Sequence, residues 1–232
     1  MQKELFRNDS YLKTCSSKII EILDEGLVLD NNVFYPEGGG QPGDTGNIKY
    51  DNKTFEIINT KYIDKKIVLC LESTAGFNLN QEMICEINWT RRFSIMQVHT
   101  CLHLLCSIIK APVTGGQISE GKGRLDFDLE SKPDKEYVIE NINKLIKGNF
   151  DVKVSSITEE ELDKNPELVR TMAVQPPRDS GMIRMISIGD DVDYQPCGGT
   201  HVKNTSEINL VTKVKVENKG RMNKRVILEL NN

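Results

Sequence analysis

The chain has 232 residues, of which 38% are hydrophobic and 28% charged, and its formal net charge is −4. This composition is typical of a globular protein with one large domain or two small ones, and it excludes a disordered chain. The acidic balance excludes a general nucleic-acid coat protein, which is usually basic, but it allows a local basic surface. No apolar run approaches the ~20 residues of a membrane helix and the N-terminus lacks a signal-peptide core, so we expect a cytoplasmic protein without a membrane partner.

The first part of the chain, from about residue 11 to 87, has a strand-like pattern. Segments such as KIIEIL, GLVLD and KIVLCLE alternate with residues that favour turns. Several short strands at this spacing predict a small β-barrel. We therefore expect an N-terminal β-barrel domain over residues 1–88.

The pattern changes at Asn88, where a helix begins. Asn88 or Thr90 is suited to cap a helix that continues through RRFSIMQVHTCLHLLCSIIK. Apolar residues lie on nearly every side of this helix, which is the pattern of a buried central helix. The helix ends before Pro112.

The remainder of the chain mixes helices and strands. We expect strands at residues 124–129, 152–157, 182–188, 208–216 and 225–230, and helices at 133–147 and 159–169. These segments do not alternate regularly as in a parallel α/β fold, so they predict an α+β domain over residues 89–232. The fold class is therefore α+β.

The three histidines of the chain fall into two spaced pairs. His99 and His103 form a His-x-x-x-His pair on the buried helix, so both imidazoles lie on one helix face. Cys197 and His201 have the same spacing in the segment Cys-Gly-Gly-Thr-His. One thiolate and three imidazoles match the ligands that Zn²⁺ prefers.

Several interpretations of these pairs stay open. A histidine on an apolar helix face is often only a core residue, and four protein ligands would fill a tetrahedral shell, as in structural zinc sites. Catalysis requires either a fifth position or one looser ligand, for which His201 is the candidate because it follows two glycines. Residue 100 is threonine, so the His-Glu-x-x-His sequence of metalloproteases is absent.

The six cysteines show no regular disulfide spacing. We expect reduced thiols, most of them small core residues beside leucine or isoleucine. Cys197 is the exception.

Two groups of basic residues have alternative roles. Arg91 and Arg92 stand at a helix start, where cations are not favoured, so they either bind a phosphate or pair with acids. Lys213, Lys215 and Arg225 belong to a basic C-terminal segment, which is either a solvated hairpin surface or a phosphate-binding surface.

Four segments together resemble a known family, the stand-alone alanyl-tRNA editing proteins called AlaX and the editing region of alanyl-tRNA synthetase. The segments are FYPEGGGQPGDTG (34–46), NWTRRFSIMQVHTCLHLL (88–105), GRLDFDL (123–129) and IRMISIGDDVDYQPCGGTHVKNTSEI (183–208). They occur in the family's order and span most of the chain. The editing domain of threonyl-tRNA synthetase, which shares the two metal-spaced pairs, is a more distant likeness.

The resemblance implies a zinc-dependent hydrolase that acts in trans on tRNA(Ala) carrying serine or glycine and cleaves the aminoacyl ester at the tRNA 3′ end. It implies that His99, His103, Cys197 and His201 bind zinc. It also places Gln117 near the substrate pocket and the glycine loop at the editing site. The chain departs from the synthetase pattern at Leu102, where a threonine often stands beside the metal.

The expected site residues then follow. Backbone N–H groups of Gly198 and Gly199 either stabilise an oxyanion or only form a turn. We assign catalytic roles to Gln117, Gly198 and Gly199, and substrate binding to Gly38, Gly39, Gly40, Gln41, Arg91, Arg92 and Thr200.

Two other classes of function compete with editing. One is a zinc-stabilised RNA-binding module without catalysis, and the other is a hydrolase of free amino-acid esters. A requirement for intact tRNA separates editing from the second alternative.

Overall fold

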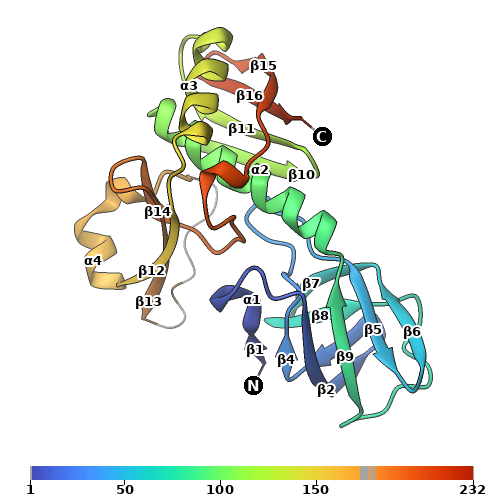
Figure 1. The fold of residues 1–232 in the computed structure, drawn as a ribbon. Coiled ribbons are helices and arrows are strands. Elements are labelled where there is room, and N and C mark those ends of the chain that lie inside the picture. Colours follow the sequence, from blue (N-terminus) through green and yellow to red (C-terminus); the bar gives the residue numbers. More distant parts are fainter. Residues whose placement is uncertain (1, 173–177, 179–180, 232) are drawn as a thin grey trace. The chain divides into compact units, whose positions relative to one another are not determined.

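The computed structural model describes residues 2–172, 178 and 181–231, and Figure 1 shows their fold. The chain divides into two units, Met1–Phe93 and Ser94–Asn232. Helix α2 (Trp89–Ile108) begins in the first unit and continues into the second.

The first unit consists mainly of strands. Its elements are β1 (Lys3–Glu4), α1 (Leu5–Asn8), β2 (Thr14–Leu23), β3 (Gly26–Leu29), β4 (Asn31–Asn32), β5 (Gly46–Tyr50), β6 (Lys53–Ile57), β7 (Asn59–Ile63), β8 (Lys66–Cys70) and β9 (Glu82–Ile87). Seven strands form one sheet in the order β6-β5-β9-β2-β3-β8-β7. Side chains such as Ile19, Leu27 and Ile48 are buried in its core.

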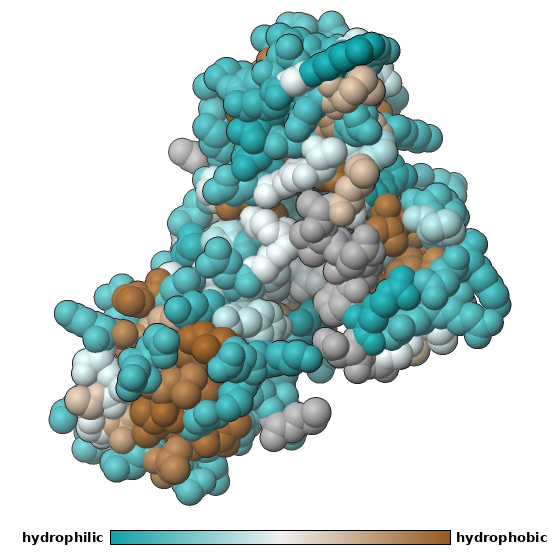
Figure 2. Space-filling view, turned by 180° about the vertical axis from the view of Figure 1, so that it is seen from behind, coloured by the Kyte–Doolittle hydropathy of each residue, from teal (hydrophilic) through white to brown (hydrophobic). Residues whose placement is uncertain are grey.

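The N-terminal barrel predicted from the sequence is not confirmed. The seven-stranded sheet has two edges, β6 and β7, which are consecutive in the chain with only Ile58 between them. Among the described residues no ladder joins these two edges, so the sheet forms an open half-barrel. A closed barrel would need hydrogen bonds along that seam. Figure 2 shows hydrophobic residues at the surface of this unit, at lower left.

The described residues of the second unit form two antiparallel sheets and two further α-helices. Its elements are β10 (Val113–Ser119), β11 (Lys122–Asp128), α3 (Lys135–Lys147), β12 (Val152–Thr158), α4 (Glu159–Lys164), the 3₁₀ helix η1 (Pro166–Leu168), β13 (Met182–Ile188), β14 (Asp193–Pro196), the 3₁₀ helix η2 (Thr205–Glu207), β15 (Val211–Gly220) and β16 (Asn223–Leu230). The sheets have the orders β10-β11-β16-β15 and β12-β13-β14. The molecule is therefore α+β, as the sequence predicts.

Local sequence explains where the helices start. Asn88 Oδ1 accepts the backbone N–H of Arg91 at 3.1 Å, so Asn88 caps α2. Asp134 accepts the N–H of Tyr137 and begins α3. Thr158 and Glu161 form a capping box that begins α4. No helix of the described residues is long and apolar enough to cross a membrane.

Helix α2 packs closely on β11 because residue 123 is glycine. A Cβ atom at Gly123 would stand 2.6 Å from Cγ1 of Val98 and 3.1 Å from Cδ1 of Leu102, which is too close without displacement of the helix. The close approach fixes α2 against the four-stranded sheet. Leu102, the position where the chain departs from the synthetase pattern, therefore lies against β11.

Candidate metal centre

Helix α2 supplies the first pair of predicted metal ligands. His99 and His103 lie one turn apart and are buried, with 9% and 6% of their surface exposed. Their ring centroids are 5.4 Å apart. The rigid backbone of a buried helix holds both rings on one side.

The loop that follows β14 supplies the second pair, Cys197 and His201. Backbone N–H of Cys197 donates to the carbonyl of Arg184 on β13 at 3.1 Å. The guanidinium of Arg184 donates to the carbonyls of Cys197 and Gly199 at 2.6 and 3.0 Å. These bonds attach the loop to β13, so its two ligand side chains do not depend on a flexible segment.

The four side chains converge on one point. Their ligand atoms all lie within 4.8 Å of one another. Cys197 Sγ is 3.5 Å from Nε2 of His99 and 3.2 Å from Nε2 of His201. The ring centroid of His201 lies 4.3 Å from that of His99 and 4.6 Å from that of His103. A single ion is therefore within reach of all four groups.

A buried carboxylate orients His103. Its Nδ1 lies 2.8 Å from Oδ2 of Asp193, and because a carboxylate only accepts, Nδ1 carries the proton. Nε2 is then the ring atom with a lone pair for a metal. Gln195 donates from Nε2 to the same carboxylate oxygen at 2.8 Å. Such a carboxylate–histidine pair is the usual support of a metal-binding imidazole.

A threonine on α2 orients His201. The hydroxyl of Thr100 donates to the carbonyl of Met96 at 2.9 Å, so its oxygen accepts from Nδ1 of His201 at 3.1 Å. The N–H of Val202 donates to the same oxygen at 3.3 Å. His201 is only 5% exposed. The ring is held as firmly as that of His103, which does not favour the prediction that His201 is the looser ligand.

The electrostatics of the cluster suit a cation. Burial raises the pKa of the Cys197 thiol, but the neighbouring charges of His99 and His201 and hydrogen bonds from the imidazoles outweigh burial and bring it well below its usual value. Burial and the charge of His99 bring the pKa of His201 well below its usual value. Burial also lowers the pKa of His103, but hydrogen bonds to Asp193 and Cys197 outweigh it and raise this pKa to about 10.

These groups fit Zn²⁺. A thiolate and a neutral imidazole are the protonation states that the metal requires, and metal binding displaces the remaining proton. The backbone N–H of Gly199 donates to Sγ of Cys197 at 3.4 Å, which stabilises a thiolate further. By contrast, burial raises the pKa of both Cys101 and Cys106 to about 12, so these thiols remain core residues.

The predicted catalytic residues lie in different surroundings. The N–H of Gly199 donates to the ligand sulfur, and its role toward an oxyanion remains a prediction. Gly198 is half-buried in the same loop, and its role remains a prediction. Gln117 lies exposed on β10, where its Oε1 accepts from Nε of Arg124 at 3.3 Å. Its catalytic role likewise remains a prediction.

The predicted substrate-binding loop is a tight turn. Gly38 and Gln41 exchange two backbone hydrogen bonds, of 3.0 and 2.9 Å. Gly39 and Gly40 between them have φ angles of 58° and 82°, the left-handed conformation that glycine adopts without strain. These two glycines are exposed, Gly38 is half-buried, and Gln41 is only 1% exposed. The exposed tip remains a candidate for substrate binding, but the buried Gln41 side chain has no surface to offer.

Of the two alternatives given for Arg92, the structure shows the pairing with an acid. Arg92 is fully buried and pairs with the carboxylate of Asp44 through Nε and Nη2. Its other guanidinium bonds reach the carbonyls of Ser10 and Val33 at 3.0 and 2.8 Å. The protein itself uses this arginine, because a buried guanidinium requires a counter-charge.

Two further predicted substrate contacts differ in exposure. Arg91 is half-buried, and its Nη2 donates to the carbonyl of Gly43 at 3.3 Å, so its role remains a prediction. Thr200 is fully buried between Gly199 and His201, so its side chain has no surface for substrate. The contacts of Arg92 lie within the protein, and the roles of Gln41 and Thr200 toward substrate remain predictions.

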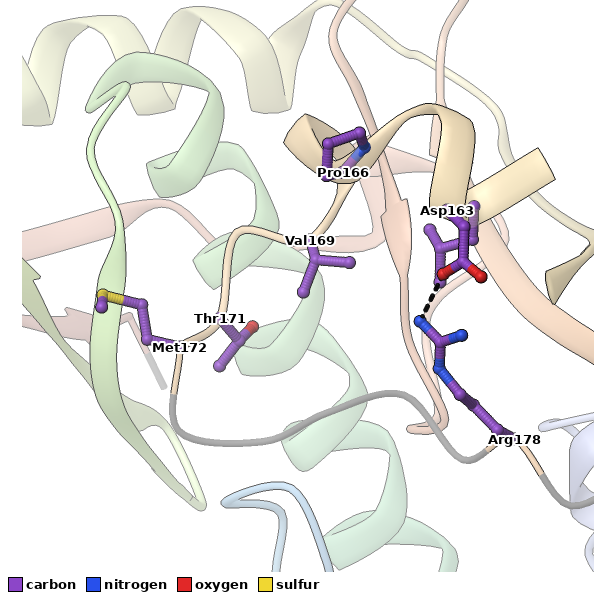
Figure 3. Close-up of a pocket in the computed structure, with 7 residues that line it drawn as sticks. Asp163, Pro166, Val169, Thr171, Met172 and Arg178 are labelled. Carbon is purple, nitrogen blue, oxygen red and sulfur yellow. Dashed lines mark ion pairs between the residues drawn. The ribbon is translucent and has the colours of Figure 1, made fainter. Parts of the chain in front are cut away.

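A separate pocket with a volume of about 420 Å³ lies elsewhere in the second unit. Figure 3 shows side chains that line it, among them Val169 and Met172, with Asp163 paired to Arg178 at 2.9 Å. None of its lining residues is a predicted site residue. The His/Cys cluster is therefore the candidate functional site.

Sequence reasoning missed the residues that orient the ligands. Asp193, Gln195 and Cys197 alternate along and just beyond β14, and the first two are each 5% exposed while Tyr194 between them is 38% exposed. Alternation in a strand places such residues on one face. The sequence DYQPC carries this period-two signal, but a four-residue strand is too short to recognise without its neighbours.

Two family descriptions match parts of the chain. Residues 183–227, which include Cys197 and His201, match the threonyl and alanyl tRNA synthetase second additional domain. Residues 7–91 match tRNA synthetases class II (A).

Curated relatives match nearly the whole chain. The alanyl-tRNA editing protein AlaX-M of Saccharolobus solfataricus is 33% identical, over 97% of this chain and 98% of its own. AlaX-M of Methanosarcina acetivorans is 31% identical over 99% of both chains. The alanine–tRNA ligase of Pyrobaculum aerophilum is 33% identical over 93% of this chain, but this match covers only 25% of the ligase. The similarity therefore extends over the whole length of the editing proteins and over a limited part of the ligase.

Proposed function

The chain belongs to the family of alanyl-tRNA editing proteins, and on this premise we propose that it is a zinc-dependent deacylase acting in trans on mischarged tRNA(Ala). The reaction is hydrolysis of the ester between the amino acid and the tRNA 3′ end. One water is consumed, and a free amino acid and a tRNA with a free terminal hydroxyl are released. Serine is the first expected wrong amino acid and glycine the second.

The convergence of His99, His103, Cys197 and His201 is the observation that carries the proposal. Residues from a helix and a distant loop meet at one point, and the outward nitrogens of two imidazoles are oriented by Asp193 and Thr100. Zn²⁺ bound there supplies a Lewis acid that polarises the ester carbonyl or lowers the pKa of water. Burying or half-burying four polar side chains costs free energy of folding, so a contribution to stability alone does not explain why they lie together.

The residues of the chain have distinct tasks in this mechanism. Asp193 and Thr100 fix which ring nitrogen faces the metal, so no reorientation is required when substrate arrives. Arg184 holds the Cys197 loop through two carbonyl groups and preserves the distance between the two ligand pairs. The half-buried position of Cys197 marks the side on which the cluster is least covered. We infer that substrate approaches from the side of Cys197.

The choice of serine and glycine follows from the limits of a synthetase active site. A pocket for alanine cannot strongly exclude the smaller glycine or the slightly larger serine, because such differences give only modest discrimination. A second hydrolytic site removes these errors. The match to one quarter of an alanine–tRNA ligase and to nearly all of the editing proteins supports editing as the activity of this chain.

The decisive experiment is a deacylation assay with Ser-, Gly- and Ala-tRNA(Ala), with and without a zinc chelator. We expect hydrolysis of the first two substrates, little hydrolysis of Ala-tRNA(Ala), and loss of activity after metal removal with recovery on addition of Zn²⁺. Equal cleavage of a free serine ester would favour a small-molecule hydrolase. Binding of tRNA without hydrolysis of any of the three would favour a zinc-stabilised RNA-binding module.

A further inference from the structure

One face of the sheet β10-β11-β16-β15 carries an ordered set of basic residues. Alternate residues of a strand share a face, and directly paired residues on neighbouring strands share it too. Lys122 pairs in register with Glu229, which pairs with Lys213. The next rows on the same face are Arg124, Ile227 and Lys215, and then Asp126, Arg225 and Glu217. We call this surface, together with Lys219 at the end of β15, the basic face.

Each of three acids on the basic face pairs with two bases. Asp126 binds Arg124 at 3.1 Å and Arg225 at 2.7 Å. Glu229 binds Lys122 at 3.2 Å and Lys213 at 3.1 Å. Glu217 binds Lys215 at 2.6 Å and Lys219 at 3.0 Å. No triad is neutral, because each contains two cations and one anion.

The charge of the basic face differs in sign from that of the chain. With Asp128 at the end of β11 as a fourth acid, six bases exceed four acids by two, whereas the chain as a whole has a net charge of −4. A positive surface on an acidic protein is not a consequence of composition. It requires that bases from the three strands β11, β15 and β16 be brought together by strand pairing.

On the basic face, each lysine side chain is more exposed than the carboxylate that pairs with it. The side chains of Lys122, Lys213 and Lys215 are 52%, 61% and 60% exposed. Those of the partner acids Glu229 and Glu217 are 33% and 25% exposed, and that of Asp126 is 12% exposed. The carboxylates pair with the Nζ atoms of the lysines and hold them in place, and the high exposure of these lysines leaves their ammonium groups accessible to an external anion as well. Ion pairs of this kind organise a binding surface in advance.

The pattern fits a phosphodiester backbone. Successive rows along a strand are roughly 6.6–6.8 Å apart, so the face presents a repeated series of positive charges. In the three rows only Ile227 is apolar, which does not suit a protein interface with a hydrophobic core. Figure 2 shows that the upper part of the molecule, where Figure 1 places β15 and β16, is predominantly hydrophilic.

We propose that the basic face binds the phosphate backbone of the tRNA substrate. The inference rests on the proposed function for the identity of the RNA. Beside the basic face, the exposed Gln117 of β10 pairs in register with Arg124 and accepts a hydrogen bond from it, so polar groups continue from the face onto the edge strand.

The test measures binding of uncharged tRNA(Ala), so that it does not depend on catalysis. The variant combines Lys122→Gln, Lys213→Gln and Lys215→Gln. The matched control combines Lys18→Gln, Lys49→Gln and Lys66→Gln, which remove the same charge from lysines that are 52%, 51% and 47% exposed and pair with glutamates of the seven-stranded sheet. Circular dichroism and zinc content establish that both proteins are folded.

Removing three phosphate contacts is expected to lower the slope of log K against log salt by about 2 to 3. Between about 50 and 200 mM salt, wild-type affinity should then fall roughly 15- to 60-fold more than that of the variant. The control should keep the wild-type slope. Equal slopes for variant and control, or no measurable binding of tRNA by wild-type protein at low salt, would overturn the inference. The deacylation assay is read separately, so a protein that deacylates without using this face contradicts only the inference.

Discussion

Two constellations of buried polar side chains in this molecule differ in whether the surrounding protein satisfies their polar atoms. In the first unit, the guanidinium of Arg92 is bonded to the carboxylate of Asp44 and to two backbone carbonyls, so protein groups of matching charge surround it. In the second unit, the atoms of His99, His103, Cys197 and His201 that face one another are all potential metal ligands. The first constellation needs no external partner, whereas the second offers four ligand atoms to one cation.

The difference shows that burial alone does not distinguish a structural residue from a ligand-binding residue. Arg92 stands at a helix start, where the sequence allowed either a phosphate ligand or a partner of an acid, and it is fully buried and paired with Asp44. The histidines of the same helix are almost as deeply buried, but their inner nitrogens converge instead of pairing with acids. A buried polar side chain therefore has a structural role when the surrounding protein completes its interactions, as for Arg92. It is a candidate ligand-binding residue when its donor or acceptor atoms converge on one point, as in the metal-ligand cluster.

The largest expected effect is on stability, at the first constellation. Arg92→Met leaves the buried carboxylate of Asp44 without its counter-charge, so we expect the free energy of unfolding to fall by about 3–5 kcal/mol. Urea unfolding followed by circular dichroism measures the change. Arg91→Met, one residue away on a half-buried side chain, is the control and should cost less than about 1 kcal/mol. Comparable losses in both variants would mean that Arg92 is not the structural partner of Asp44.

The second prediction concerns the metal. Cys197→Ala removes the anionic ligand, so zinc content should be lost and deacylation should fall more than about 100-fold. His201→Ala should weaken zinc binding less, because it removes a neutral ligand. Elemental analysis and single-turnover deacylation provide the two measurements. Full activity in zinc-free protein would contradict the role assigned to the cluster.

The third prediction addresses the support of the ligands. Asp193→Asn keeps the shape of the side chain but removes the negative charge beside His103, so zinc affinity should fall about 10- to 100-fold. Competition with a chromophoric chelator measures this affinity without reference to activity. Leu102→Met, on the same helix but against β11, is the control and should leave zinc affinity unchanged. A purely structural role of Asp193 would lower the unfolding temperature without a change in zinc affinity.

The smallest expected effect is at an exposed ion-pair triad. Hydrogen bonds from Lys215 and Lys219 lower the pKa of Glu217 from 4.5 to about 2. A depressed pKa stabilises the folded protein above the unfolded value and loses this contribution as pH falls from about 4.5 toward 2. Glu217→Gln should therefore reduce stability slightly at pH 6 and not at all at pH 2. Chemical unfolding of both proteins at several pH values tests this, and a difference that grows on acidification would contradict it.

The sequence by itself determined the elements with strong local signals. The buried helix, the α+β class and the pairing of the four metal-ligand candidates all follow from spacing and periodicity. The sequence offered Asn88 or Thr90 as the helix cap, and the structure selects Asn88. Strands β10 and β14 were not predicted. The two glycines of VTGGQIS indicate a loop, and DYQP is too short to show alternation, so only pairing with β11 and β13 makes these segments strands.

Tertiary structure alone decided which polar residues are satisfied from within. The sequence does not show that Asp44 lies beside Arg92, that Asp193 orients His103, or that Gly199 donates to the Cys197 sulfur. It also does not bring Lys122 and Lys213 to the same glutamate, although the two are far apart in the chain. Local propensity and periodicity are short-range properties, whereas hydrogen bonds and ion pairs between distant segments depend on strand register and helix packing. For that reason the ligands were readable from the sequence, while the groups that hold them were not.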